Sequence, residues 1–425
     1  MQKIIDFHIH SKYSRATSKA FDLNEMLKWS EIKGVDIISA ADFTHPAWFK
    51  NLQNNLTEDK TGSGLYQLNN SKSKVRFILA TEISCIYSQN GKTRRVHLCV
   101  LMPSLSAVAK FNQALADRGA KLASDGRPIL GISAKEILQI ALEADENSLV
   151  IPAHVWTPWF AVFGSKSGFD SLVECFEDLT PHISALETGL SSDPLMNWLW
   201  SDLDDLLLLS NSDAHSGPHI GREANIFDLS ENSFSEFAQI IKNKDKNKFL
   251  ATIEFYPELG MYHFDGHRAC NFSCSPDDTF KKHKGICPKC KKALTLGVLS
   301  QVEKLADRDI KLVDKIGRVP FKSIVPLPEI IADYYGVGRS SKKVNSLFQE
   351  LIAKGANEFN ILLDLDLEEL KKIMPTDLAL GIMRMRQGNI EIVPGFDGQY
   401  GEALIFSDTN KKSVKVKASQ VTLFD

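Results

Sequence analysis

The chain has 425 residues, of which 43% are hydrophobic and 24% charged, and its formal net charge is −3. This composition is ordinary for a soluble globular protein of two or three domains, and the net charge alone does not indicate nucleic-acid binding. No apolar run is long enough to span a bilayer, and Met1 to Lys3 lead straight into a strand. We therefore expect a cytoplasmic protein with no membrane partner.

The first predicted strand covers residues 3–11 and carries a pattern of metal-binding groups. Because side chains alternate along a strand, Asp6, His8 and His10 share one face, and the apolar residues between them take the other. Imidazole suits zinc, iron and manganese, and carboxylate suits the harder ions. The strand therefore predicts one edge of a metal site.

Strand and helix units then alternate to about residue 255. After Asp22, a predicted N-cap, a helix runs to Gly34; residues 51–75 look like a polar surface insertion, and Ser133 and Ser233 can cap later helices. Buried strands are expected near residues 35–41, 76–80, 96–102, 149–153, 183–186 and 206–209. Repeated β-α units with polar residues at the strand ends indicate an α/β barrel of about seven strands.

Each of these strands brings a candidate ligand to its end. The set consists of His8, His10, Asp42, His45, Glu82, His97, His154, Asp213 and His215. Nine ligands are too many for one tetrahedral zinc, and they suit two or three metals (Zn, Mn or Mg) that share a bridging carboxylate. Glu187 follows another strand and is interpreted either as a group that orients a ligand or as part of a buried salt bridge.

Basic and aromatic residues flank these ligands. Arginine forks match phosphate groups, and flat aromatic rings stack on unpaired bases. The alternatives are surface ion pairs for the arginines and core packing for the rings. The candidates for DNA contact in this part of the chain are Arg15, Arg94, Arg95, Arg222, Trp156, Trp159 and Phe160.

The character of the sequence changes near residue 256. Cys270-x3-Cys274 and Cys287-x2-Cys290 have the spacing of a closed, structural zinc site, so we expect a four-cysteine zinc-binding domain over residues 256–300. Lys281 and Lys282 lie between the cysteine pairs. Residues 242–318 hold 16 Lys and Arg against 10 Asp and Glu, which permits a basic face for a phosphate backbone.

The last predicted domain, residues 301–425, reads as mainly helical. Gly336 to Ser341 precede one helix and fit either a phosphate site at its N-terminus or a plain turn and cap. Residues 394–401 are rich in glycine, but their spacing is not that of a nucleotide-binding loop. No nucleotide cofactor is therefore expected.

The motifs of the first domain resemble the PHP (polymerase and histidinol phosphatase) family. The resemblance rests on Asp6-Phe7-His8-Ile9-His10, Asp42-Phe43-Thr44-His45, Thr81-Glu82, His97, Ala153-His154 and Asp213-Ala214-His215. It implies a distorted seven-stranded barrel over residues 1–255 with a trinuclear centre that hydrolyses phosphoesters. One metal would be held by His8, His10, Glu82 and Asp213, another by Glu82, His97 and His154, and a third by His45 and His215. Since the family usually places Asp and His side by side in the second motif, the choice between Asp42 and His45 stays open.

The order of the parts narrows this resemblance to the endonuclease Q family. A PHP barrel, a cysteine-rich ribbon and a helical region that ends in Pro394-Gly395-Phe396-Asp397-Gly398-Gln399-Tyr400-Gly401 are similar to that family throughout the chain. The resemblance implies a DNA repair enzyme that nicks DNA 5′ of deaminated bases (hypoxanthine and uracil) and of abasic sites. Because a metal centre at the mouth of a barrel cannot reach a base inside a duplex, we expect the damaged nucleotide to be flipped out. The implied catalytic residues are Glu82, His154, Asp213 and His215, with His154 or His215 protonating the leaving oxygen.

Two other functional classes remain open from the sequence. One is a small-molecule phosphatase of the histidinol-phosphate type, although a small ester requires neither a ribbon nor a helical tail. The other is a DNA-binding protein without catalysis, which the extensive ligand set disfavours. The sequence does not indicate an oligomeric state.

Overall fold

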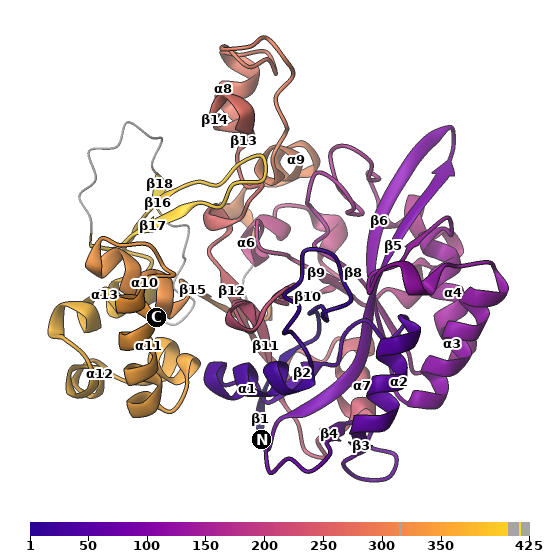
Figure 1. The fold of residues 1–425 in the computed structure, drawn as a ribbon. Helices are drawn as coiled ribbons and strands as arrows, with labels where there is room; N and C mark the ends of the chain where they lie inside the picture. The colour runs from indigo at the N-terminus through magenta and orange to yellow at the C-terminus, as the bar shows by residue number, and fades with distance from the viewer. Residues whose placement is uncertain (314–316, 407–415, 418–425) are drawn as a thin grey trace.

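The computed structural model describes residues 1–313, 317–406 and 416–417. Its largest feature is a mixed sheet in which the strands follow the order β15-β12-β11-β1-β2-β5-β4-β3, with β6 and β7 also on β5 and β8 on β6 (Figure 1). The predicted α/β class is confirmed. These strands are β1 (Gln2–Asp6), β2 (Ile37–Ser39), β3 (Leu56–Glu58), β4 (Tyr66–Leu68), β5 (Arg76–Gln89), β6 (Lys92–Met102), β7 (Ile129–Leu130), β8 (Leu149–Pro152), β11 (Ala224–Asp228), β12 (Phe249–Phe255) and β15 (Phe321–Ile324).

Two further strands, β9 (Ala185–Glu187) and β10 (Leu207–Leu209), form a parallel pair beside this sheet. Val155 N–H donates to the Glu187 carbonyl (3.1 Å), and His10 N–H donates to the Ala214 carbonyl (2.9 Å). These bonds join the segments that follow β8, β9, β10 and β1. The ends of successive strands therefore meet at one place, as the sequence predicts.

The first strand is shorter than expected. It ends at Asp6, and beyond it Phe7 N–H donates to the Asn211 side chain instead of a neighbouring strand (3.0 Å). The Asp6 carboxylate does not join the histidines, because it accepts bonds from the Ser212 and Gly221 amides. The predicted polar insertion also contains order, since β3 and β4 pair within it.

Helices cover the outside of the sheet in Figure 1. Asp22 caps α1, which Gly34 ends at φ 91°, and Ser133 and Ser233 cap α4 and α7 as predicted. The helices of this part are α1 (Leu23–Lys33), α2 (Pro46–Asn55), α3 (Leu105–Asp117), α4 (Ala134–Ala144), α5 (Leu172–Phe176), α6 (Pro194–Asn197) and α7 (Phe234–Lys242).

Residues from 256 onward build two further parts. One rises at the top of Figure 1 and contains β13 (Asp265–His267), β14 (Phe272–Cys274), α8 (Pro276–Lys281) and α9 (Val298–Leu305). The other, at the left, contains α10 (Leu327–Tyr335), α11 (Lys342–Gly355), α12 (Leu367–Ile373), α13 (Thr376–Arg386), β16 (Glu391–Val393), β17 (Glu402–Leu404) and β18 (Val416–Lys417). Between them, β15 returns to pair with β12 in the large sheet, which the sequence did not predict.

The glycine-rich segment 394–401 packs backbone to backbone against residues 258–264. Gly395 N–H donates to the Glu258 carbonyl (2.8 Å), and a Cβ on Gly395 would lie 2.2 Å from the Gly260 carbonyl oxygen. Glycine is needed because the two chains approach so closely. The contact carries Tyr400 from the C-terminal part to the strand ends. Within the described ranges, no helix is long and apolar enough to cross a membrane.

Candidate metal centre

Potential metal ligands gather where β1, β8 and β10 have ended and on the inner parts of β5 and β6, which carry Glu82 and His97. Two of the groups share Glu82: His8, His10, Glu82 and Asp213 form one, and Glu82, His97 and His154 form the other. Within each group, one ligand atom from every residue lies within 4.8 Å of the others. Because Glu82 belongs to both groups, the arrangement suits two cations that share one carboxylate.

His8 shows that this cluster fits a cation. Its Nε2 is buried without a hydrogen-bond partner among the described residues, at 3.6 Å from Glu82 Oε2 and 3.7 Å from Asp213 Oδ1. Its Nδ1 lies 3.0 Å from Glu187 Oε1. A carboxylate on one ring nitrogen fixes the tautomer and leaves a lone pair on the other, the usual arrangement of a metal-binding histidine. The contact of Glu187 with His8 fits both interpretations of the sequence, the orienting group and the buried salt bridge.

The carboxylates of the cluster need positively charged partners, a role that a cation can fill. Burial opposes ionisation of Glu82, but His97 and Arg127 outweigh it and hold the pKa of this carboxyl well below its usual range. Burial would lower the pKa of His10, yet hydrogen bonds with Asp213 and Asp42 raise it to about 10. In the protein alone, carboxylates are thus stabilised by protonated imidazole; metal ions would take over that role.

Asp42 and His45 lie outside both ligand groups. The Asp42 carboxylate accepts bonds from Ser11 N–H, Ser11 Oγ and Ser14 Oγ at 2.7–2.8 Å, and its other oxygen lies 3.3 Å from His10 Nδ1. Asp42 therefore orients His10. His45 is separated from Asp42 by two residues and lies directly before α2. Its ring stacks on Tyr13, with 4.2 Å between the ring centroids.

His215 lies beside His10, with 4.4 Å between ring centroids. Its Nδ1 donates to the Asp213 carbonyl (2.9 Å), and its side chain is 25% exposed. The backbone is strained at three residues of the centre, since φ is 40° at Asp42, 31° at His154 and 46° at Asp213. Positive φ outside glycine is uncommon, and such strain gathers at functional sites.

A cavity of about 560 Å³ opens over the metal ligands. Its lining includes the candidate ligands His97, His154 and Asp213 together with aromatic and apolar side chains, which are Trp159, Phe160, Met261, Tyr262 and Tyr400. Trp159 and Tyr262 meet edge to face at 5.9 Å. The cavity therefore places flat rings beside the metal ligands, as expected for Trp159 and Phe160.

Trp156 does not line this cavity. It is 1% exposed, its indole N–H donates to Asn197 (2.8 Å), and it packs on Phe163 and Trp200. Its predicted contact with a base is contradicted, because the core packing alternative applies. The cavity is also lined by three residues that the sequence analysis did not identify as site residues, which are Arg127, Tyr262 and Tyr400. They were missed because they follow no strand that carries a ligand.

The predicted basic residues fall into two kinds. Arg94 and Arg222 are each 8% exposed; Arg94 lies over the Phe169 ring at 4.0 Å, and Arg222 donates to the Ser212 carbonyl (2.8 Å). Both are therefore held by the protein itself, although Arg222 also lines the cavity over the metal ligands and Arg94 lines a second cavity. Arg15 is largely exposed beside Asp125, and Arg95 lines this second cavity, of about 530 Å³, with Lys92, Lys166 and Lys304.

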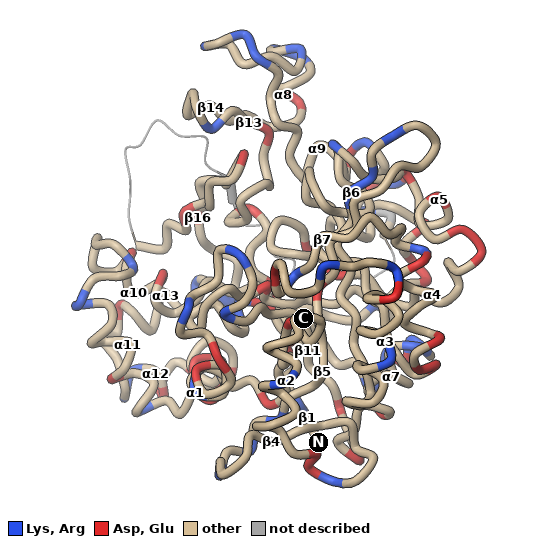
Figure 2. Tube along the Cα trace, turned by 45° about the vertical axis from the view of Figure 1, so that its right-hand side comes forward, with Lys and Arg blue, Asp and Glu red and all other residues tan. Residues whose placement is uncertain are grey.

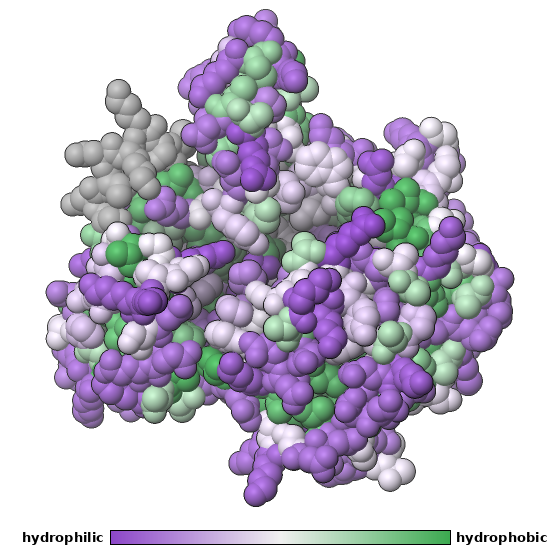
Figure 3. Space-filling view, viewed as in Figure 1, coloured by the Kyte–Doolittle hydropathy of each residue, from purple (hydrophilic) through white to green (hydrophobic). Residues whose placement is uncertain are grey.

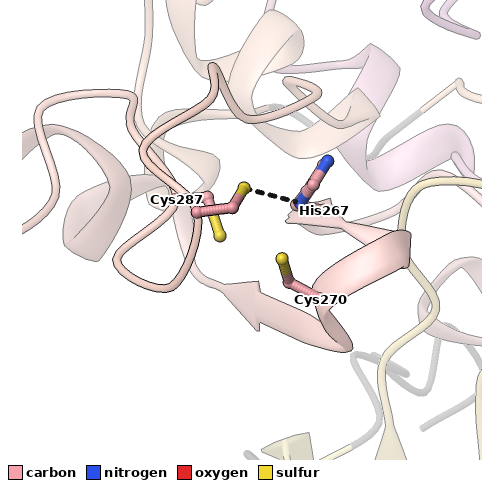
Figure 4. Close-up of side chains that lie close together, drawn as sticks. His267, Cys270 and Cys287 are labelled. Carbon is pink, nitrogen blue, oxygen red and sulfur yellow. Dashed lines mark hydrogen bonds between the residues drawn. The ribbon is translucent and has the colours of Figure 1, made fainter.

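The cysteine cluster differs from the predicted four-cysteine set. His267, Cys270, Cys287 and Cys290 lie together, and Figure 4 shows His267, Cys270 and Cys287 converging on one point. The Cys274 thiol instead contacts Thr279 Oγ1 at 3.1 Å. Although burial opposes it, the amides of Cys290 and Lys289 lower the pKa of Cys287 to about 6. Three thiols and one imidazole fit tetrahedral zinc.

Lysines crowd the outer end of this cysteine-rich part. Figure 2 shows blue Lys and Arg segments above α8, and Figure 3 shows a hydrophilic surface there that surrounds a smaller apolar area. Lys281 and Lys282 are 72% and 66% exposed, but each pairs with an aspartate one turn earlier at 2.8 Å. Exposed pairs of this kind are weak, so both lysines can exchange partners.

Comparisons with known proteins agree with this architecture. Residues 326–389 match the model of the MJ0043 C-terminal domain. The uncharacterized protein MJ0043 of Methanocaldococcus jannaschii is 35% identical over 276 residues, which are 63% of this chain and 34% of that protein. The uncharacterized protein YqxK of Bacillus subtilis is 29% identical, over 95% of this chain and 99% of that protein.

Two solved structures match nearly the whole chain. The lesion-specific endonuclease PfuEndoQ of Pyrococcus furiosus is 31% identical with a TM-score of 0.82, over 95% of both chains. An endonuclease Q in complex with a 27-mer duplex that carries an abasic lesion at the active site is 32% identical with a TM-score of 0.85, over 97% of this chain and 99% of that one. The chain belongs to the endonuclease Q family, which makes it a hydrolytic nuclease.

Proposed function

We propose that this protein is a metal-dependent DNA repair endonuclease that hydrolyses the phosphodiester 5′ of deaminated bases and abasic sites. The observation that carries the proposal is the cavity whose lining combines candidate metal ligands with the rings of Trp159 and Tyr262. A base inside a duplex cannot reach such a centre, so the damaged nucleotide would be flipped into it. We further propose that the strands around the centre form the seven-stranded PHP barrel, that residues 1–255, 256–300 and 301–425 are its three domains, and that the second holds zinc.

In the mechanism, His8, His10, Glu82 and Asp213 would hold one metal, and Glu82, His97 and His154 another. The ions would supply hydroxide near neutral pH and neutralise charge on the phosphoryl group. Asp42 and Glu187 keep His10 and His8 in place. His154 is held by Glu82 and Thr157, so we assign His215 to protonate the leaving 3′-oxygen, which leaves a 3′-hydroxyl and a 5′-phosphate.

The test uses the full-length protein loaded with Zn, Mn or Mg and labelled duplexes that each carry one uracil, hypoxanthine or abasic site. We expect a nick 5′ of each lesion and no cut in the undamaged duplex. Asp213→Asn, which removes one carboxylate ligand, should reduce cutting by at least about 100-fold. Hydrolysis of a chromogenic phosphomonoester without any nick would favour the small-molecule phosphatase, and a nick 3′ of the lesion would refute the assignment.

A further inference from the structure

Arg127 lies in a short segment that is fixed against the metal centre. The segment follows a turn at residues 122–124 and leads into β7, and three backbone amides hold it in place. Gly126 N–H donates to the Tyr13 carbonyl (3.1 Å), Ser84 N–H donates to the Pro128 carbonyl (3.0 Å), and Arg127 N–H donates to Asp125 Oδ1 (3.1 Å). The start of the Arg127 side chain is therefore defined before any ligand binds.

Gly126 brings this segment unusually close to the centre. A Cβ on Gly126 would lie 2.3 Å from Asp42 Oδ2 and 2.4 Å from Ser14 Oγ. Asp42 cannot give way, because its carboxylate is buried and bonded to Ser11 and Ser14. Only glycine fits between the segment and the carboxylate that orients His10, and this fit places Arg127 beside the ligands.

The Arg127 guanidinium reaches the shared ligand and remains open to the cavity. Nη1 lies 2.9 Å from Glu82 Oε2, the side chain is 25% exposed, and it lines the cavity with His97, His154 and Asp213. Within the described part of the chain, its side-chain hydrogen bonds involve Nη1 alone. A guanidinium has five N–H donors, so most of its fork is available to a ligand.

The charge balance identifies that ligand as an anion. Glu82 and Asp213 would coordinate the metals, and Glu187 and Asp42 are the other two carboxylates in contact with the cluster. Two divalent cations would balance these four carboxylates, and Arg127 would leave the site with a net positive charge. Such a site attracts an oxyanion, and arginine binds the oxygens of a phosphate group with a fixed fork of donors.

We propose that Arg127 binds a non-bridging oxygen of the scissile phosphodiester and stabilises the charge that develops on it. The inference rests on the proposed nuclease function and names a catalytic residue of that site. A cation held by Glu82 would weaken the hold of this carboxylate on the guanidinium, and the Arg127 donors would then be free to bind the phosphate. The alternative role is that of a counter-ion that only keeps Glu82 ionised.

The experiment compares the wild-type chain with Arg127→Gln and Arg127→Lys, and uses Arg118→Gln as the matched control. Arg118 also pairs with a glutamate, Glu136 at 3.6 Å, but lies at the end of α3. Metal content and single-turnover cutting of an abasic-site duplex are measured for each chain. We expect Arg127→Gln to retain its metals and to cut about 100- to 1,000-fold more slowly, with partial recovery in Arg127→Lys.

Two further measurements separate the roles. The affinity for the same duplex is measured for Asp213→Asn and for the double variant that also carries Arg127→Gln. The added substitution should lower the affinity only about tenfold. A sulfur atom is then placed on either non-bridging oxygen of the scissile phosphate; replacement of the oxygen that Arg127 contacts should slow the wild type more than Arg127→Gln. Loss of metal from Arg127→Gln, or an unchanged response to both sulfur positions, overturns the inference. Failure of the wild type to cut any duplex would instead refute the proposed function.

Discussion

The ligand set of the cysteine-rich part can be tested by exchanging two residues that the sequence and the structure assign differently. Cys274 belongs to the four-cysteine spacing, whereas His267 belongs to the cluster in the structure. His267→Ala should remove a zinc ligand. Cys274→Ser should leave all four ligands in place, and its hydroxyl can keep the contact with Thr279 that the thiol makes at 3.1 Å.

The expected magnitude follows from the four equal positions of the cluster. Zinc binding by small structural sites contributes roughly 10–16 kcal/mol at neutral pH, so one ligand of four accounts for about 3 kcal/mol. At 1.36 kcal/mol for each factor of ten, His267→Ala should weaken zinc binding by roughly 100- to 1,000-fold. Cys274→Ser should change it by less than about tenfold.

The assay measures zinc per chain after dialysis and then competition with a coloured chelator. Both variants should retain the metals of the strand-end centre, which shares no residue with this cluster. If Cys274→Ser releases zinc while His267→Ala keeps it, the four-cysteine site of the sequence interpretation is correct and the assignment of His267 is wrong.

Two other predictions concern the cavity and the buried carboxyls. Trp159→Ala should reduce cutting at uracil and hypoxanthine about tenfold more than at abasic sites, which offer no base to stack, and equal losses would contradict the stacking role. Burial raises the pKa of Asp193 to about 8, so the folded protein binds this proton more tightly than the unfolded chain and the free energy of unfolding falls as pH rises from about 4 to about 8. Asp193→Asn keeps the cap on Met196 and should flatten thermal stability between about pH 5 and about pH 8, by at most about 1.4 kcal/mol per pH unit; an unchanged slope would assign it to other groups.

Sequence reasoning succeeded where a periodic pattern determines position. His8 and His10 follow β1 with the alternation that places them on one face, Glu82 lies within β5, and Asp213 follows β10. Their convergence could be predicted because each belongs to a predicted strand unit whose polar residues point to one place, although β10 lies outside the large sheet. The same rule failed for Asp6, since it predicts the face of a side chain and not its partners.

Residues outside strands were not predictable in this way. His267 and Cys274 lie on the paired strands β13 and β14 but are not opposite each other. His267 pairs with Phe272, and Cys274 pairs with Asp265. Spacing alone favours Cys274 as the fourth ligand over His267, which lies three residues before Cys270. Only the paths of the two strands show which of these side chains turns to the cluster. Trp156 was misassigned for a similar reason, because its loop runs inward before Trp159 turns out.

The cavity joins parts of the chain that no local pattern connects. Tyr262 and Tyr400 reach it because the glycine-rich segment 394–401 packs on residues 258–264, and Tyr400 then accepts a hydrogen bond from Arg222 (3.0 Å). Arg222 also donates to the Ser212 and Asp213 carbonyls. One buried arginine thus links the strained turn of a metal ligand to the C-terminal part. The Tyr400 side of the cavity and the loop that holds Asp213 are therefore positioned by the same arginine, so a change in the C-terminal part would be felt at a candidate metal ligand.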